Sequence, residues 1–230
     1  MSSVKIRRDI GFYVYFRREL VLARSAIGAT TAPILFMFMG VSLIPLALSS
    51  DTASQSSIAP GFVWIMVLLA SLMSIERIFT FDYDDGSLEQ LLISPQLLVQ
   101  PIFGKVAAHW VLTGLPMSLS SPIMALVLSL PAEGYIPMML SIIIGSAYLS
   151  LVGSVCASLT VSLGRGGFLL PITLIPLYMP MIIFGSATID FAVNSMDWSF
   201  PLAVMGTLLC LAIAICPIAV AAILRSTILF

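Results

Sequence analysis

The stretch GFVWIMVLLASLMSIERIFTFDYDDGSLEQLLISP, residues 61–95, begins with 15 uncharged residues and ends in an acidic turn and a leucine-rich segment. A helix needs about 20 mostly apolar residues to cross a bilayer. The first part of the stretch therefore predicts a membrane span, and Glu76 and Arg77 mark where it leaves the membrane. The second part predicts a short charged element outside the bilayer.

The composition of the whole chain agrees with a membrane protein. Its 230 residues are 60% hydrophobic and only 9% charged, and the mean hydropathy is +1.11. A soluble globule needs more polar surface than this. The three cysteines lie in apolar runs without metal-ligand spacing, so we expect them to pack as small apolar residues. The composition indicates one integral membrane domain over residues 1–230 and excludes a nucleic-acid partner.

Six stretches are apolar enough to span a membrane, which predicts an all-α fold. They cover residues 26–48, 61–79, 103–128, 136–163, 168–189 and 202–224. Residues 49–60, SSDTASQSSIAP, are rich in turn-forming residues and are expected to connect the first two spans. In the fourth span, small residues such as Gly145 and Gly153 predict close contact with neighbouring helices.

The basic residues predict the orientation. All ten Lys and Arg residues fall on one side of a six-span arrangement, and the other side carries Asp51, Glu133, Asp190 and Asp197. Lys and Arg near span ends mark the cytoplasmic face. We therefore expect a multi-pass membrane protein with both termini in the cytoplasm. The middle of each span lacks a charged residue, which disfavours a proton-coupled pump.

The segment before the first span, residues 4–22, is predicted to form an amphipathic helix at the membrane interface. Its apolar residues recur at helical spacing: Ile6, Ile10, Tyr13, Phe16 and Leu20. The alternative is a charged tail that only sets the orientation of the chain.

Residues 84–94 are predicted to form a short cytoplasmic helix. Gly86 permits a tight turn, Ser87 and Gln90 have the spacing of a capping box, and Pro95 ends the helix. Leu88, Leu91 and Leu92 share one face. Two interpretations stay open: the leucines pack on the chain's own helix ends or the membrane surface, or the helix docks on a soluble partner.

The motif ERIFTFDYDDGSLEQLLISP followed by GKVAAHW resembles the cytoplasmic segment of ABC-2 type transporter permeases. Within that group the chain is similar to the cytochrome c maturation permeases, the heme exporter protein B (CcmB-type) family, along almost its whole length. The resemblance implies a non-enzymatic permease subunit of the bacterial inner membrane that binds no cofactor itself and works with an ABC ATPase, which binds ATP. It also implies haem-handling membrane subunits and a periplasmic haem chaperone as partners, and two copies of the chain per complex.

The resemblance and the acidic charge of the segment together indicate which residues couple the permease to its ATPase. They are Asp84, Asp85, Gly86, Ser87, Leu88, Glu89, Gln90, Leu91, Leu92 and Pro95. Glu76 and Arg77 either relay movement of this segment into the second span or pair with each other or with lipid headgroups. Arg165 is expected to anchor a second cytoplasmic turn.

The predicted function is to couple ATP hydrolysis in a partner to haem delivery or to release of the haem-loaded chaperone. Alternatives are a permease that exports another substrate and a scaffold that transports nothing. His109 is the only histidine, and its neighbours Lys105 and Trp110 favour interface anchoring over haem ligation.

Opposite charges collect in two segments predicted to be cytoplasmic. Residues 5–24 carry six basic and two acidic residues, and residues 76–90 carry five acidic residues and one basic residue. We therefore expect the N-terminal helix to pack beside the acidic segment, or both to border one docking surface for the ATPase.

Overall fold

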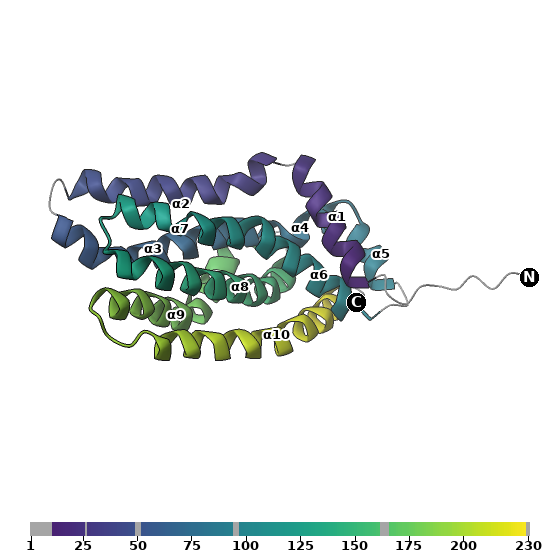
Figure 1. Ribbon diagram of the computed structural model, residues 1–230. Coiled ribbons are helices and arrows are strands. Elements are labelled where there is room, and N and C mark those ends of the chain that lie inside the picture. Colours follow the sequence, from purple (N-terminus) through teal and green to yellow (C-terminus); the bar gives the residue numbers. More distant parts are fainter. Residues whose placement is uncertain (1–10, 26, 49–51, 94–96, 162–165, 229–230) are drawn as a thin grey trace, which may run out of the picture.

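The computed structural model describes residues 11–25, 27–48, 52–93, 97–161 and 166–228, and all regular structure in these residues is helical. The long helices lie side by side as a bundle, and the shorter α1, α4 and α5 gather at one end of it (Figure 1). The long helical segments are α2 (Ile27–Ala47), α3 (Thr52–Ile75), α6 (Val99–His109), η1 (Trp110–Gly114), α7 (Leu115–Val127), α8 (Tyr135–Thr160), α9 (Gly166–Val193) and α10 (Ser199–Ile228). The short ones are α1 (Gly11–Ser25), α4 (Arg77–Asp84), α5 (Ser87–Ile93) and η2 (Ala132–Gly134).

Within the described residues, six helical stretches are long and apolar enough to cross a membrane, which confirms the predicted all-α membrane fold. α6, η1 and α7 together form one of them, and α3 runs into α4 in another. This second stretch has 33 residues, so at about 1.5 Å per residue it exceeds the ~30 Å of a bilayer's hydrocarbon core. Its charged α4 end therefore extends beyond the hydrocarbon.

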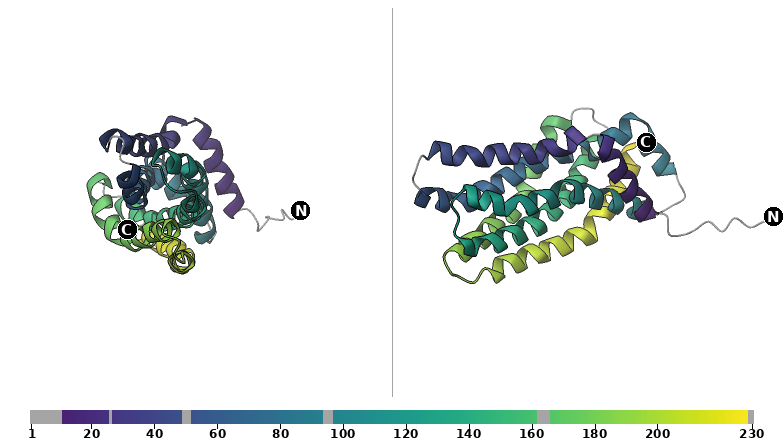
Figure 2. Two further views of the ribbon diagram at one scale, coloured as in Figure 1. Left: turned by 60° about the vertical axis from the view of Figure 1, so that its left-hand side comes forward. Right: turned by 45° about the horizontal axis from the view of Figure 1, so that its top comes forward.

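α8 lies at the centre of the bundle, in contact with α3, α7, α9 and α10 (Figure 2). A reciprocal pair of tyrosines joins α8 to α9. Tyr148 Oη donates a hydrogen bond to Leu177 O at 3.2 Å, and Tyr178 Oη donates one to Leu149 O at 2.7 Å. These bonds satisfy the buried hydroxyl of Tyr178 and the half-buried Tyr148, and they fix how the two antiparallel helices lie along each other.

Trp64 of α3 fills a slot between two glycines. A Cβ added at Gly145 of α8 or at Gly185 of α9 would lie 2.1 Å from the indole. The ring is fully buried, and its Nε1 has no hydrogen-bond partner in the part of the chain that the structure describes. Close contact at Gly145 agrees with the expectation for small residues in this span, and Gly153 also lies against Tyr178 and Ile75.

The third span contains a π-helical turn, η1, just before α7. Pro116 follows it and lacks a backbone N–H, so the chain cannot continue a regular hydrogen-bond ladder there. Trp110, the first residue of η1, donates from Nε1 to Ser146 Oγ of α8 at 3.1 Å. This contact holds the irregular turn against the central helix.

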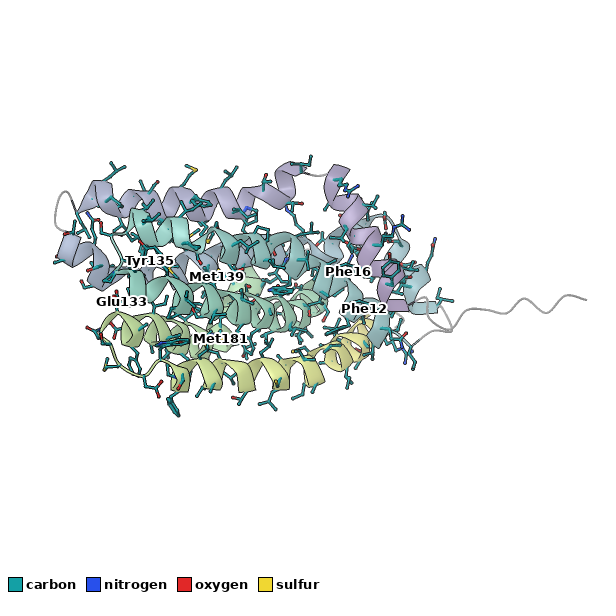
Figure 3. The ribbon with its side chains drawn as sticks, viewed as in Figure 1. Phe12, Phe16, Glu133, Tyr135, Met139 and Met181 are labelled. Carbon is teal, nitrogen blue, oxygen red and sulfur yellow. The ribbon has the colours of Figure 1, made fainter. Side chains whose placement is uncertain are left out.

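The two ends of the bundle differ. α1, α4, α5 and the last turns of α10 lie at one end, called here the α5 end, and the connections near Glu133 lie at the other (Figure 1, Figure 3). Phe12 and Phe16 of α1 are at the α5 end (Figure 3). α1 and the end of α10 thus lie on the same side of the bundle, as six spans require.

One expectation about local structure is wrong. Of the segment predicted as a connector, residues 52–60 form the first turns of α3, which begins at Thr52, and residues 49–51 lie outside the described residues. Serine hydroxyls there bond back to the helix, for example Ser56 Oγ to Ala53 O at 3.0 Å, so their turn-forming chemistry is used within the helix.

The apolar stripe expected on the N-terminal helix is described only in part. Ile6 and Ile10 lie outside the described residues, Tyr13 is 63% exposed, and Phe16 and Leu20 are half-buried, so the interfacial helix stays a prediction. α1 packs on α6 through Phe12, whose ring centroid is 5.7 Å from that of Phe103. The backbones meet so closely that a Cβ at Gly104 would lie 2.5 Å from Phe12 O.

Candidate functional site

α5 has an inner face of leucines and an exposed outer face. Leu88, Leu91 and Leu92 are 1%, 6% and 5% exposed and belong to the core, so they pack on the chain's own helices. The outer face consists of Glu89, Gln90 and Ile93, and Ile93 is 75% exposed. A helix of about two turns is not stable alone in water, and the buried leucines explain why it forms.

The turn before α5 is built as the sequence indicates, but its cap is different. Gly86 has a φ of +74°, which glycine adopts without strain. Ser87 is the first residue of the helix, and its N–H donates to Asp85 Oδ1 at 2.8 Å, so Asp85 replaces the predicted capping box. Hydrogen bonding from Ser87 lowers the pKa of Asp85, which keeps this exposed carboxylate ionised.

A cluster of four charges lies behind α5 and joins three helices. The four-charge cluster consists of Arg18 and Glu19 from α1, Asp82 from α4 and Lys105 from α6. Asp82 and Lys105 are at its centre, with side chains 5% and 6% exposed, and Lys105 Nζ lies 2.5 Å from Asp82 Oδ2 and 2.8 Å from Glu19 Oε1. Each charge has an opposite partner, as buried ions require.

Arg18 completes the four-charge cluster and connects it to α5. Its Nη2 lies 3.1 Å from Asp82 Oδ1 and donates to Ser87 Oγ at 3.3 Å. Partial burial works to lower the pKa of Arg18, but the hydrogen bond and charge of Asp82 outweigh it and raise that pKa. The N-terminal helix therefore packs beside the acidic segment, as the opposite charges of the two segments predict.

The other predicted site residues lie in three places. Asp84 and Asp85 are exposed at the end of α4, next to the outer face of α5. Glu76 and Arg77 are exposed at the junction of α3 and α4, and no ion pair joins them in the described chain. Arg165 and Pro95 lie outside the described residues.

His109, which the sequence predicts to anchor at the membrane interface, lies between helices. Its Nδ1 lies 3.0 Å from Ser150 Oγ of α8, and its Nε2 lies 3.1 Å from Ser74 Oγ of α3. Both ring nitrogens therefore have hydrogen-bond partners, and His109 links three helices. Across the described residues, no group of three His, Cys, Asp or Glu side chains is arranged to hold a metal ion.

Sequence reasoning missed Asp82 as a buried residue and Ile93 as an exposed one. The signal for Asp82 is present in the helical period: Ile75, Ile78 and Phe79 are buried, and Asp82 continues the same face. Its partners Lys105 and Arg18 are 23 and 64 residues away, so spacing alone does not reveal the cluster.

Comparisons with known proteins agree along nearly the whole chain. A family model described as CcmB protein matches residues 11–227. Among curated proteins, heme exporter protein B of Haemophilus influenzae is 39% identical over 214 residues, which cover 93% of this chain and 97% of that protein. Heme exporter protein B of Pseudomonas aeruginosa is 39% identical over 210 residues, 91% of each chain. The Escherichia coli K12 protein of that name is 38% identical over 217 residues, 94% of this chain and 99% of its own.

Proposed function

The chain belongs to the CcmB protein family, and from that premise we propose that it is the permease subunit of an ABC-type complex for cytochrome c maturation. As a multi-pass inner-membrane protein of this family, it is a haem-related permease and not itself an enzyme. In the proposal, a partner ATPase hydrolyses ATP, and this chain converts the movement into rearrangement of its membrane helices.

The observation that carries the proposal is the two-sided structure of α5. Its leucines are buried in the chain's own core, so they hold the helix in place and are not available to a partner. The outer face presents the acidic Glu89 and the exposed, apolar Ile93, with Asp84 and Asp85 beside them. An apolar residue with acidic groups near it fits a basic groove on a soluble protein. The charges would orient the bound partner more than they would raise its affinity.

The four-charge cluster supplies the path from this docking face into the membrane. Ser87, at the start of α5, is bonded to Arg18, which is paired with Asp82, and Asp82 is paired with Lys105 of α6. α6 leads into η1 and α7 of the third span. A push on α5 would therefore move α1, α4 and the start of the third span together.

The wider assembly follows from the same premise. Two ATPase subunits would act on two copies of this chain, with haem-handling membrane subunits and a periplasmic haem chaperone as further partners. Haem would be handled by these partners and not ligated by His109, since both of its ring nitrogens are hydrogen-bonded to serines.

The test is chaperone release by the purified complex with an active and with a hydrolysis-deficient ATPase. A coupled permease releases the haem-loaded chaperone only with the active ATPase. Equal release by both complexes would show that the chain is a scaffold. As a control, the two preparations must contain the same amount of this chain and of ATPase.

A further inference from the structure

A cavity of about 560 Å³ lies beside the four-charge cluster at the α5 end. Its wall is formed by residues of α1, α2, α3, α4, α6 and η1, so it spans the junction between the membrane helices and the charged segment. This volume is in the range of cavities that hold small ligands.

Two opposite charges of α4 line this cavity outside the four-charge cluster. Glu19, Asp82 and Lys105 also line it, but they pair within the cluster. Arg77 and Asp84 are exposed, and no hydrogen bond or ion pair of either side chain is recorded in the described chain. They are seven positions apart, so they lie on one face of α4, about 10 Å apart along its axis.

The residues that line the cavity change from charged at the α5 end to mostly apolar further into the bundle. Arg77 directly follows the end of α3, and Asp84 is at the far end of α4, so Arg77 lies nearer the hydrocarbon. On the side away from these charges, Leu112 and Thr113 of η1 extend the lining into the third span. A molecule that fits this order has an anionic group, then a cationic group further out, and an apolar part directed into the membrane.

We propose that the cavity binds an aminophospholipid of the cytoplasmic leaflet. Arg77 holds the phosphate, to which a guanidinium can donate two hydrogen bonds, and Asp84 holds the ammonium group. The glycerol and the first chain carbons lie against Ile78 and Leu112. This assigns Arg77 a lipid partner and does not depend on the proposed transport function.

The test measures lipid binding to the full-length protein in detergent by native mass spectrometry. The probes are phosphatidylethanolamine, phosphatidylglycerol and soluble glycerophosphoethanolamine. We expect phosphatidylethanolamine to bind about tenfold more tightly than the other two, because only it has both charges and the chains. Arg77→Gln weakens binding of both lipids about tenfold, and Asp84→Asn weakens only that of phosphatidylethanolamine.

Two further variants keep the outcome clear. Arg225→Gln removes an exposed cation of α10 that does not line the cavity and must bind lipid like the wild type. Ala23→Trp places an indole in the cavity without changing charge and must weaken specific binding about tenfold, which decides the matter if Arg77→Gln does not fold. The proposal is overturned if phosphatidylethanolamine and phosphatidylglycerol bind equally tightly, or if the soluble headgroup binds as tightly as the lipid. It is also overturned if Arg77→Gln weakens lipid binding no more than Arg225→Gln does, or if Ala23→Trp binds lipid as tightly as the wild type.

Discussion

Lys105 Nζ of α6 lies 2.5 Å from Asp82 Oδ2 of α4, and both side chains are almost fully buried. The two residues join a membrane span to the acidic segment that is the candidate docking site. Because both side chains are almost fully buried, each ion depends on the other and on the outer members of the cluster, Glu19 and Arg18. This pair therefore contributes to stability and lies on the path proposed for coupling.

Lys105→Met is expected to lower the free energy of unfolding by about 3 kcal/mol, because it removes one partner of a buried ion pair. Arg18 still holds Asp82, which keeps the loss at the low end of the range for such pairs. Thermal unfolding in detergent measures the effect. Arg225→Met, which removes an exposed cation at the same end, is the control and should change little.

A double-mutant cycle measures the interaction between Lys105 and Asp82 apart from their contacts with other residues. Lys105→Met combined with Asp82→Leu should cost at least about 1 kcal/mol less than the sum of the single variants, because the remaining Arg18 and Glu19 can pair. Strictly additive losses would mean that the two residues do not interact in the folded protein.

Gly145→Ala is expected to lower the free energy of unfolding by about 2 kcal/mol, because the added Cβ would overlap the buried indole of Trp64. Trp64→Phe should rescue part of the loss, since a smaller ring relieves the overlap and no hydrogen bond of Nε1 is lost. Gly206→Ala in α10 is the matched control: its Cβ meets nothing within 4 Å, so higher helix propensity should leave stability equal or raised. Thermal unfolding measures the stability of each variant. Equal changes in stability for Gly145→Ala and Gly206→Ala would contradict the packing argument.

The sequence predicts the parts of this protein that depend on local patterns. Six apolar stretches predict the six long helices, and the spacing of Leu88, Leu91 and Leu92 predicts the face of α5 that is buried. Gly86 predicts the tight turn before it. Each depends on residues within a few positions of one another, where helical period and turn chemistry decide the structure.

The parts that could not be predicted depend on contacts between distant residues. Asp82, Asp84 and Asp85 look alike in the sequence, yet only Asp82 is buried, because Lys105 and Arg18 pack against it. The start of α3 at Thr52 was missed since serine-rich segments favour turns, and here their hydroxyls bond within the helix. The sequence also does not reveal that Ser74 and Ser150 lie at the two ring nitrogens of His109, because these serines are 35 and 41 residues away from it.

His109→Ala is expected to lower the free energy of unfolding by about 2 kcal/mol, because it leaves two buried or half-buried serines without their partner. His109→Gln should recover part of this loss, since an amide can also donate and accept. Thermal unfolding of the two variants compares them. If the role of His109 were to ligate haem iron, His109→Gln would not recover the stability lost in His109→Ala. The amount of haem bound to the purified complex would then fall equally in both variants.

Replacing Glu89 by Lys and Ile93 by Ser together is expected to weaken binding of the partner ATPase about tenfold, because the outer face of α5 loses its apolar centre and reverses its charge. Co-purification of the ATPase with the full-length chain at increasing salt measures the loss. Glu133→Lys reverses an exposed acidic residue at the opposite end of the bundle and is the matched control (Figure 3). Because the buried leucines of α5 are untouched, the double variant should unfold at the wild-type temperature, so a loss of ATPase would reflect docking and not folding. Undiminished recruitment by this variant would place the ATPase contact elsewhere on the chain.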